Sequence, residues 1–195
     1  MALTFSARRV RAMDQRDREL LLETARASIE FGVREGVPLA VDPSAHGHTL
    51  QRLGASFVTL RIDGDLRGCM GTSTPMRALI IDVADNAFAA AFRDSRFQPL
   101  AQSEVESLSI GISVLSDVEP IAFRSEEDLL AQLRPGVDGL VLQAGLHRGT
   151  FLPAVWETLG DKRVFLSHLK EKAGLSADYW SDSLEVSRYT TESFP

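Results

Sequence analysis

Hydrophobic residues recur every three or four positions along the first long segment of the chain. They are Leu21, Leu22, Ala25, Ile29 and Val33. This period places apolar side chains on one face of an α-helix. Asp14 precedes the segment as a suitable N-cap, and Gly36 follows it as a stop signal. The pattern therefore predicts an amphipathic helix between these two residues, with its apolar face anchoring the core.

A β-hairpin is predicted further along the chain. Residues 57–62 have the composition of a strand, and Asp63 and Gly64 directly after them favour a two-residue turn. A type I′ turn needs positive φ at both positions, which these residue types tolerate. Residues 65–70 should therefore return antiparallel. The pairs that follow from a regular register are Ile62 with Asp65, Leu60 with Arg67, and Val58 with Cys69.

A second helix is predicted after the hairpin. Thr74 can cap it, and Pro75 can occupy its first position, where a missing N–H costs nothing. Its inner stripe consists of Leu79, Val83, Ala87 and Ala90. Residues 108–114 then alternate apolar with small polar side chains, which is the period of a half-buried strand.

The second half of the chain mixes short strands and helices. We expect helices that start at Ser125 and Asp161, and strands over residues 139–143 and 184–189. Consecutive strands are joined by hairpin turns as often as they are separated by helices. This arrangement favours an α+β fold, with a mainly antiparallel sheet and flanking helices, over a doubly wound parallel fold.

The length and charge of the chain restrict its class. Its 195 residues suit one domain, which we expect over residues 13–195 after a flexible N-terminus over residues 1–12. A net charge of −6 argues against nucleic-acid binding, because that affinity needs clustered positive charge. The longest apolar run, residues 87–92, is too short to cross a membrane.

Cysteine use and motifs narrow the chemistry. The lone cysteine, Cys69, excludes an intramolecular disulfide and favours a cytoplasmic location. No phosphate-binding loop, dinucleotide fingerprint or metal-binding cysteine pair occurs, so we expect no cofactor and no metal. His46 and His48 have a spacing that metals can use, but no third ligand accompanies them.

The returning strand of the hairpin carries the candidate chemistry. In the regular register, Arg67 and Cys69 project from the same side of it, with Cβ atoms about 7 Å apart. A guanidinium at that distance favours thiolate over thiol. The following helix N-terminus would offer backbone N–H groups to an anion. The residues expected to bind this small anionic ligand are Gly68, Gly71, Thr72, Ser73 and Thr74.

Structural interpretations compete with this one. Cys69 beside Val58 can be a small buried hydrophobe, and the glycines can accommodate a bulge. Asp94 and Arg96 can divide into one paired and one ligand-binding residue, or form a local salt bridge. Glu104 can cap the segment before the next strand or supply a carboxylate to the site.

One segment resembles a known family signature. Leu66-Arg67-Gly68-Cys69-Met70-Gly71 is similar to the Leu-Arg-Gly-Cys-Ile-Gly motif of the AMMECR family, whose prokaryotic members are called AmmeMemoRadiSam system protein A. Met70 replaces the isoleucine, which is a tolerable apolar exchange. Further similarity covers residues 54–60, 90–100, 112–115, 149–156 and 172–175.

The resemblance implies a two-lobed α+β domain with the signature near a cleft between the lobes, and no established reaction. It also implies two partners, a Memo-type protein and a radical S-adenosylmethionine (radical SAM) enzyme. Two hypotheses follow. In the first, Cys69 is a nucleophile or redox thiol, with Arg67 as its counter-charge. In the second, the chain is a non-catalytic binding or scaffold component of that system.

Overall fold

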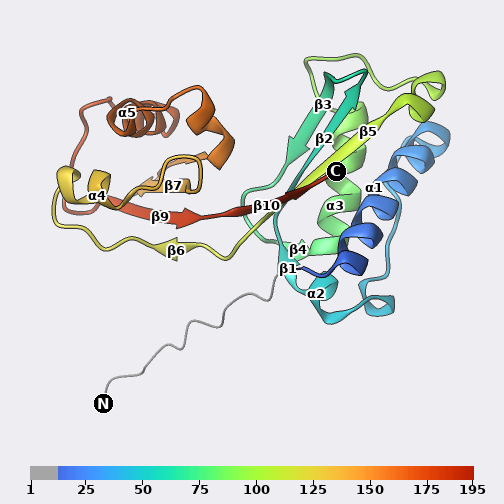
Figure 1. Cartoon of the computed structure of the whole chain (residues 1–195), viewed down its shortest axis with the longest axis horizontal. Helices are drawn as coiled ribbons and strands as arrows, with labels where there is room; N and C mark the ends of the chain where they lie inside the picture. The colour runs from blue at the N-terminus through green and yellow to red at the C-terminus, as the bar shows by residue number, and fades with distance from the viewer. Residues whose placement is uncertain (1–12) are drawn as a thin grey trace. The chain divides into compact units, whose positions relative to one another are not determined.

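The computed structural model describes residues 13–195, which form two compact units (Figure 1). The first unit runs up to Val114 and includes Ser193–Pro195; the second is Leu115–Glu192. The flexible segment predicted over residues 1–12 lies outside the described residues. Helices combine with mainly antiparallel sheets, and this confirms the α+β prediction. No helix in the described part of the chain is long and apolar enough to span a membrane.

The first unit consists of two long helices and a four-stranded sheet. The helices are α1 (Gln15–Glu35) and α3 (Leu79–Phe92). The sheet has the order β10 (Thr191–Phe194), β5 (Ser109–Leu115), β2 (Ser56–Ile62), β3 (Asp65–Gly71). Smaller elements are η1 (Pro43–Ala45), α2 (His48–Gln51), η2 (Gln102–Ser107), and the paired strands β1 (Leu53–Gly54) and β4 (Arg77–Ala78).

Helix α1 has the ends that the sequence predicts. The Asp14 side chain accepts a hydrogen bond from the Asp17 backbone N–H at 2.8 Å. Gly36 ends the helix in the left-handed region with φ 73°, where a residue without Cβ is not strained. The helix therefore begins and ends by local chemistry.

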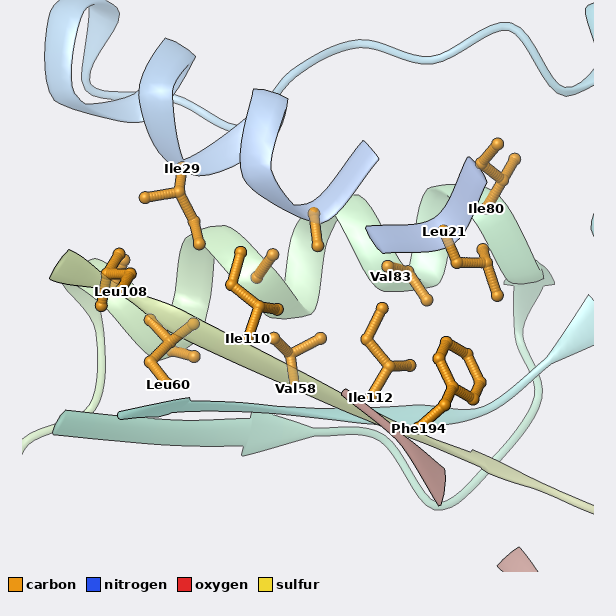
Figure 2. Close-up of a cluster of buried hydrophobic side chains, with 14 of the residues drawn as sticks. Leu21, Ile29, Val58, Leu60, Ile80, Val83, Leu108, Ile110, Ile112 and Phe194 are labelled. Carbon is orange, nitrogen blue, oxygen red and sulfur yellow. The ribbon is translucent and has the colours of Figure 1, made fainter. Parts of the chain in front are cut away.

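One face of the sheet packs against both helices to form the core of the first unit (Figure 2). The core side chains include Leu21, Ile29, Val58, Leu60, Ile80, Val83, Ile110, Ile112 and Phe194. Ala87, Ala90 and Ala91 on α3 are also buried, and their small side chains allow the helix to lie close to the sheet.

The hairpin forms as predicted, but its register does not. Asp63 and Gly64 have φ values of 52° and 89°, as a type I′ turn requires. A β-bulge then leaves Arg67 without a partner, so that Leu60 faces Gly68 and Thr59 faces Cys69. The regular register would have placed the Arg67 guanidinium beside Leu60 on the core side of the sheet. An unpaired charge there is costly, and the bulge avoids this cost.

The start of the second helix was also predicted wrongly. Helix α3 begins at Leu79, with Ala78 as its N-cap, and not at Pro75. Arg77 and Ala78 pair instead with β1, and the Leu79 N–H donates to the Arg52 carbonyl at 2.8 Å. This strand pairing competes with the local helix signals and delays the helix by one turn.

The second unit has its own sheet and core. Its sheet order is β6 (Glu119–Pro120), β9 (Glu185–Tyr189), β7 (Gly139–Ala144), β8 (His147–Phe151). The helices are α4 (Glu126–Gln132), η3 (Pro153–Glu157) and α5 (Lys162–Lys172). Trp156 stacks on Phe165 at 3.7 Å between ring centroids within a core that also contains Leu140 and Leu169. The predicted helices at Ser125 and Asp161 are confirmed, since both residues act as N-caps.

Candidate functional site

Cys69 lies on the face of the first unit's sheet that is opposite the helices. Val58 and Leu60 point into the core, so Thr59 between them points to the other face (Figure 2). Cys69 is paired with Thr59, and its Sγ lies 3.4 Å from Thr59 Oγ1. The cysteine is half-buried and has no disulfide. The neighbour of the thiol is therefore the Thr59 hydroxyl, and not the Val58 side chain that the regular register predicts.

An acid–base pair from the segment after α3 holds the backbone of Cys69. Asp94 Oδ2 accepts the Cys69 N–H at 2.9 Å, and the carboxylate also binds Arg96 Nε at 2.9 Å and Nη2 at 2.6 Å. Arg96 Nη2 further approaches the Cys69 carbonyl at 3.4 Å. β3 is an edge strand, so these two side chains satisfy backbone groups that no neighbouring strand reaches. Asp94 is only 7% exposed.

The same pair sets the local electrostatics. Hydrogen bonds from Arg96, assisted by the Cys69 N–H, hold the pKa of the Asp94 carboxyl well below its usual range despite burial. In turn, Asp94 raises the pKa of Arg96. Both groups are charged at neutral pH and form a local salt bridge, as one of the two interpretations predicted.

Arg67 is held by a different carboxylate. Its Nε and Nη2 bind Glu104 at 2.7 and 3.0 Å, and its Nη1 donates to the Gln98 carbonyl at 3.0 Å. The hydrogen bond from Arg67 lowers the pKa of Glu104. Glu104 also accepts the Ala101 N–H at 2.8 Å, so its predicted capping role is confirmed. Each arginine of the site thus has its own acid.

Close packing explains why the signature has glycine at positions 68 and 71. A Cβ on Gly68 would lie 2.1 Å from the Ala90 carbonyl oxygen of α3. A Cβ on Gly71 would lie 2.3 Å from the Phe57 ring and 2.5 Å from the Ser56 carbonyl oxygen. Both positions therefore need a residue without a side chain in the folded protein, whether or not a ligand binds.

The predicted anion-binding loop does not lead directly into a helix. Thr72, Ser73 and Thr74 precede β4, and helix α3 starts at Leu79. The Thr72 hydroxyl donates to Asp82 Oδ1 at 2.8 Å, and its N–H donates to the Ser56 carbonyl at 2.9 Å. The helix that the prediction relied on is thus absent at this position.

Sequence reasoning missed a buried polar cluster around Asp82. This carboxylate is 1% exposed and binds the backbone and hydroxyl of Ser56, the amide of Asn86 and the guanidinium of Arg77. It ties the start of β2 to the end of β3 and to α3. Asp82 and Asn86 are four residues apart within an otherwise apolar helix, and this spacing was the available signal.

No group of three or more metal-binding side chains lies within residues 13–195. His46 is the C-cap of the short helix η1, His48 is the first residue of α2, and neither belongs to such a group.

The fold and the hairpin define an α+β protein whose signature lies on an edge strand. The AMMECR1 family model matches residues 22–194, and the chain belongs to this family. A protein of Methanothermobacter thermautotrophicus is 35% identical over 176 residues, covering 89% of this chain and 91% of the relative. A protein of Thermotoga maritima is 35% identical over 168 residues, covering 85% and 91%.

A solved structure agrees with this assignment. The crystal structure of the uncharacterized protein PH0010 from Pyrococcus horikoshii matches with a TM-score of 0.76 and 32% sequence identity. The match covers 90% of this chain and 89% of that one. The resemblance noted from the signature is therefore confirmed at the level of the family and the fold.

Proposed function

We propose that Cys69 is the reacting group of a small-ligand site on the sheet face opposite α1 and α3. The observation that carries this proposal is the half-buried Cys69, whose Sγ lies 3.4 Å from the Thr59 hydroxyl and whose backbone N–H binds Asp94. A reacting group needs support of this kind, because small displacements of a nucleophile reduce its rate strongly.

Arg96 is the cation that we assign to this site, in place of Arg67. Glu104 and Gln98 engage all three nitrogens of Arg67, and its side chain is 15% exposed. The Arg96 side chain is 55% exposed, and its Nη1 donates no hydrogen bond to residues 13–195. A carboxylate or phosphate of the ligand can bind this free edge while Asp94 holds the other.

The proposed chemistry is nucleophilic addition by the thiol. The Cys69 proton goes to solvent, and the sulfur electron pair forms a bond to an electrophilic carbon of the ligand. The π electrons of the carbon–oxygen double bond move to the oxygen. The Arg96 guanidinium stabilises the negative charge that forms there. Thr59 contributes a hydroxyl that can donate to the thiolate.

Alkylation with iodoacetamide, followed by intact mass, tests this proposal. The chain has one cysteine, so every added label reports Cys69 alone. We expect faster labelling of the folded chain than of a urea-unfolded control, and slower labelling of Arg96→Gln. Arg163→Gln, an exposed arginine of the second unit, is the matched control. Folded protein that reacts no faster than the unfolded control removes the nucleophile.

A second candidate is a non-catalytic component that binds a Memo-type protein and a radical SAM enzyme. Its support is the exposure of two large apolar side chains, Leu53 within β1 at 64% and Met76 just before β4 at 78%. Co-purification separates the candidates. If the scaffold function is correct, Cys69→Ala retains both partners and Leu53→Ser with Met76→Ser releases them; recovery of neither partner by the unmodified chain rejects it.

A further inference from the structure

Two segments of the second unit separate after a short pairing and border an open hollow. Strand β6 pairs with β9 through Glu119 and Pro120, and the Ile121 N–H donates to the Val186 carbonyl at 2.9 Å. Beyond this bond the chain turns toward α4. The hollow between residues 120–124 and 180–187 has a volume of about 510 Å³, which lies in the range of small-molecule sites.

An aromatic wall borders this hollow. The rings of Phe123 and Trp180 lie 5.6 Å apart at 58°. Lys170, which does not line the hollow, places its Nζ 5.9 Å from the Trp180 ring centroid and binds Glu126 at 2.6 Å. Lys170 is 1% exposed, so this support for the ring is buried. The wall is in place before any ligand arrives, and it suits a flat or large apolar group.

Residues with charges of both signs line the same hollow without forming an ion pair to one another. Arg124, Asp182 and Glu185 are exposed, and no ion pair joins the arginine to either carboxylate in residues 13–195. A simple anion there would meet two carboxylates, and a simple amine would leave the guanidinium unmatched. A molecule that carries both charges complements all three side chains.

We propose that this hollow binds a small zwitterion of the amino-acid class with an aromatic or large apolar side chain. The ammonium group lies toward Asp182 and Glu185, and the carboxylate binds Arg124. The side chain packs on Phe123 and Trp180. This site is separate from Cys69 and does not depend on the function proposed for that residue.

Three related probes test the ligand class by NMR of the full chain. L-phenylalanine carries both charges, phenethylamine lacks the carboxylate, and 3-phenylpropionate lacks the ammonium. The readout is the indole N–H signal of Trp180, assigned with Trp180→Phe, while buried Trp156 is the internal reference. We expect L-phenylalanine to shift the Trp180 signal alone, and each single-charge probe to bind about three- to fivefold more weakly.

Exposed rim variants complete the test. Asp182→Asn and Arg124→Gln should each weaken L-phenylalanine binding about three- to fivefold, whereas Glu157→Gln, an exposed carboxylate outside the hollow, should not. Cys69→Ala should bind as tightly as the unmodified chain, so failure here is separate from failure at the thiol. The proposal is overturned if the Trp180 signal does not move, or if either single-charge probe binds as tightly as L-phenylalanine.

Discussion

The backbone N–H of Cys69 donates to the carboxylate of Asp94 at 2.9 Å, across 25 residues of sequence. In a sheet interior this N–H would bind a neighbouring strand, but β3 is an edge. Asp94 supplies the acceptor, and Arg96 supplies a donor to the carbonyl of the same cysteine. The edge is thereby closed to pairing with other chains at this residue, while the cysteine side chain stays half-buried.

Replacement of Asp94 by alanine should destabilise the protein by about 1–3 kcal/mol. The substitution leaves the Cys69 N–H without its acceptor and Arg96 without its acid, and an unsatisfied buried donor costs this much. Urea unfolding measures the change. Asp94→Asn is the graded control, because its one carbonyl oxygen can still accept the Cys69 N–H. Equal stability of the alanine variant and the unmodified protein would contradict the edge role.

Acid should weaken the fold through Asp94 and Glu104. The pKa of each carboxyl is lowered in the folded protein, mainly by a hydrogen bond from its arginine. Such groups stabilise the fold above their unfolded pKa values, about 3.9 for Asp and 4.3 for Glu, and lose this contribution as pH falls through the folded values. Unfolding free energy from pH 7 to 3 should fall less steeply in Asp94→Asn and Glu104→Gln. Parallel curves for all three proteins would reject the assignment.

Gly68 should be intolerant of alanine, and Gly111 should be tolerant. A Cβ at Gly68 meets the Ala90 carbonyl oxygen at 2.1 Å, so we expect a loss above about 3 kcal/mol or no folded protein. A Cβ at Gly111 meets nothing closer than 3.9 Å, and Gly111→Ala should change stability by about 0.5 kcal/mol or less. Thermal unfolding of both variants compares them directly; a stable Gly68→Ala protein would show that the strand is not held against α3.

Arg67 and Glu104 should be energetically coupled. Their two-bond contact is partly buried, with side-chain exposures of 15% and 30%, so a double-mutant cycle with Arg67→Gln and Glu104→Gln should give about 1 kcal/mol. Added salt should reduce this coupling only in part, because burial limits screening. A coupling of zero would mean that the two side chains act independently.

Loss of the Thr59 hydroxyl should slow alkylation of Cys69. If the hydroxyl stabilises the thiolate, Thr59→Val should reduce the iodoacetamide rate between about twofold and tenfold, the range of one hydrogen bond. Ser113→Ala is the matched control, since its hydroxyl bonds to Ser193 instead. A rate that rises or stays constant in Thr59→Val would remove this role for the hydroxyl.

Local signals accounted for much of the fold. The ends of α1 follow from Asp14 and Gly36, and the hairpin turn follows from Asp63 and Gly64. In each case the decisive contacts or dihedral angles lie within a few residues, so the sequence contains the whole cause. The predicted start of α3 was wrong for the opposite reason. The residues before the helix pair with a strand more than twenty positions earlier, and this pairing prevents the helix from starting at Pro75.

The sequence by itself determined the α+β class, the first helix, the hairpin and the family signature, because short-range periodicity, caps and turn preferences carry them. Only the tertiary structure decided which groups Arg67 and Arg96 bind. The bulge removes Arg67 from the core side and turns Gly68 toward α3, and Arg67 then binds Glu104, 37 residues away. Asp94 and Arg96 bind each other and reach the backbone of Cys69 from 25 and 27 residues away. Such choices depend on which charges can be paired once the chain is packed, and no local pattern encodes that outcome.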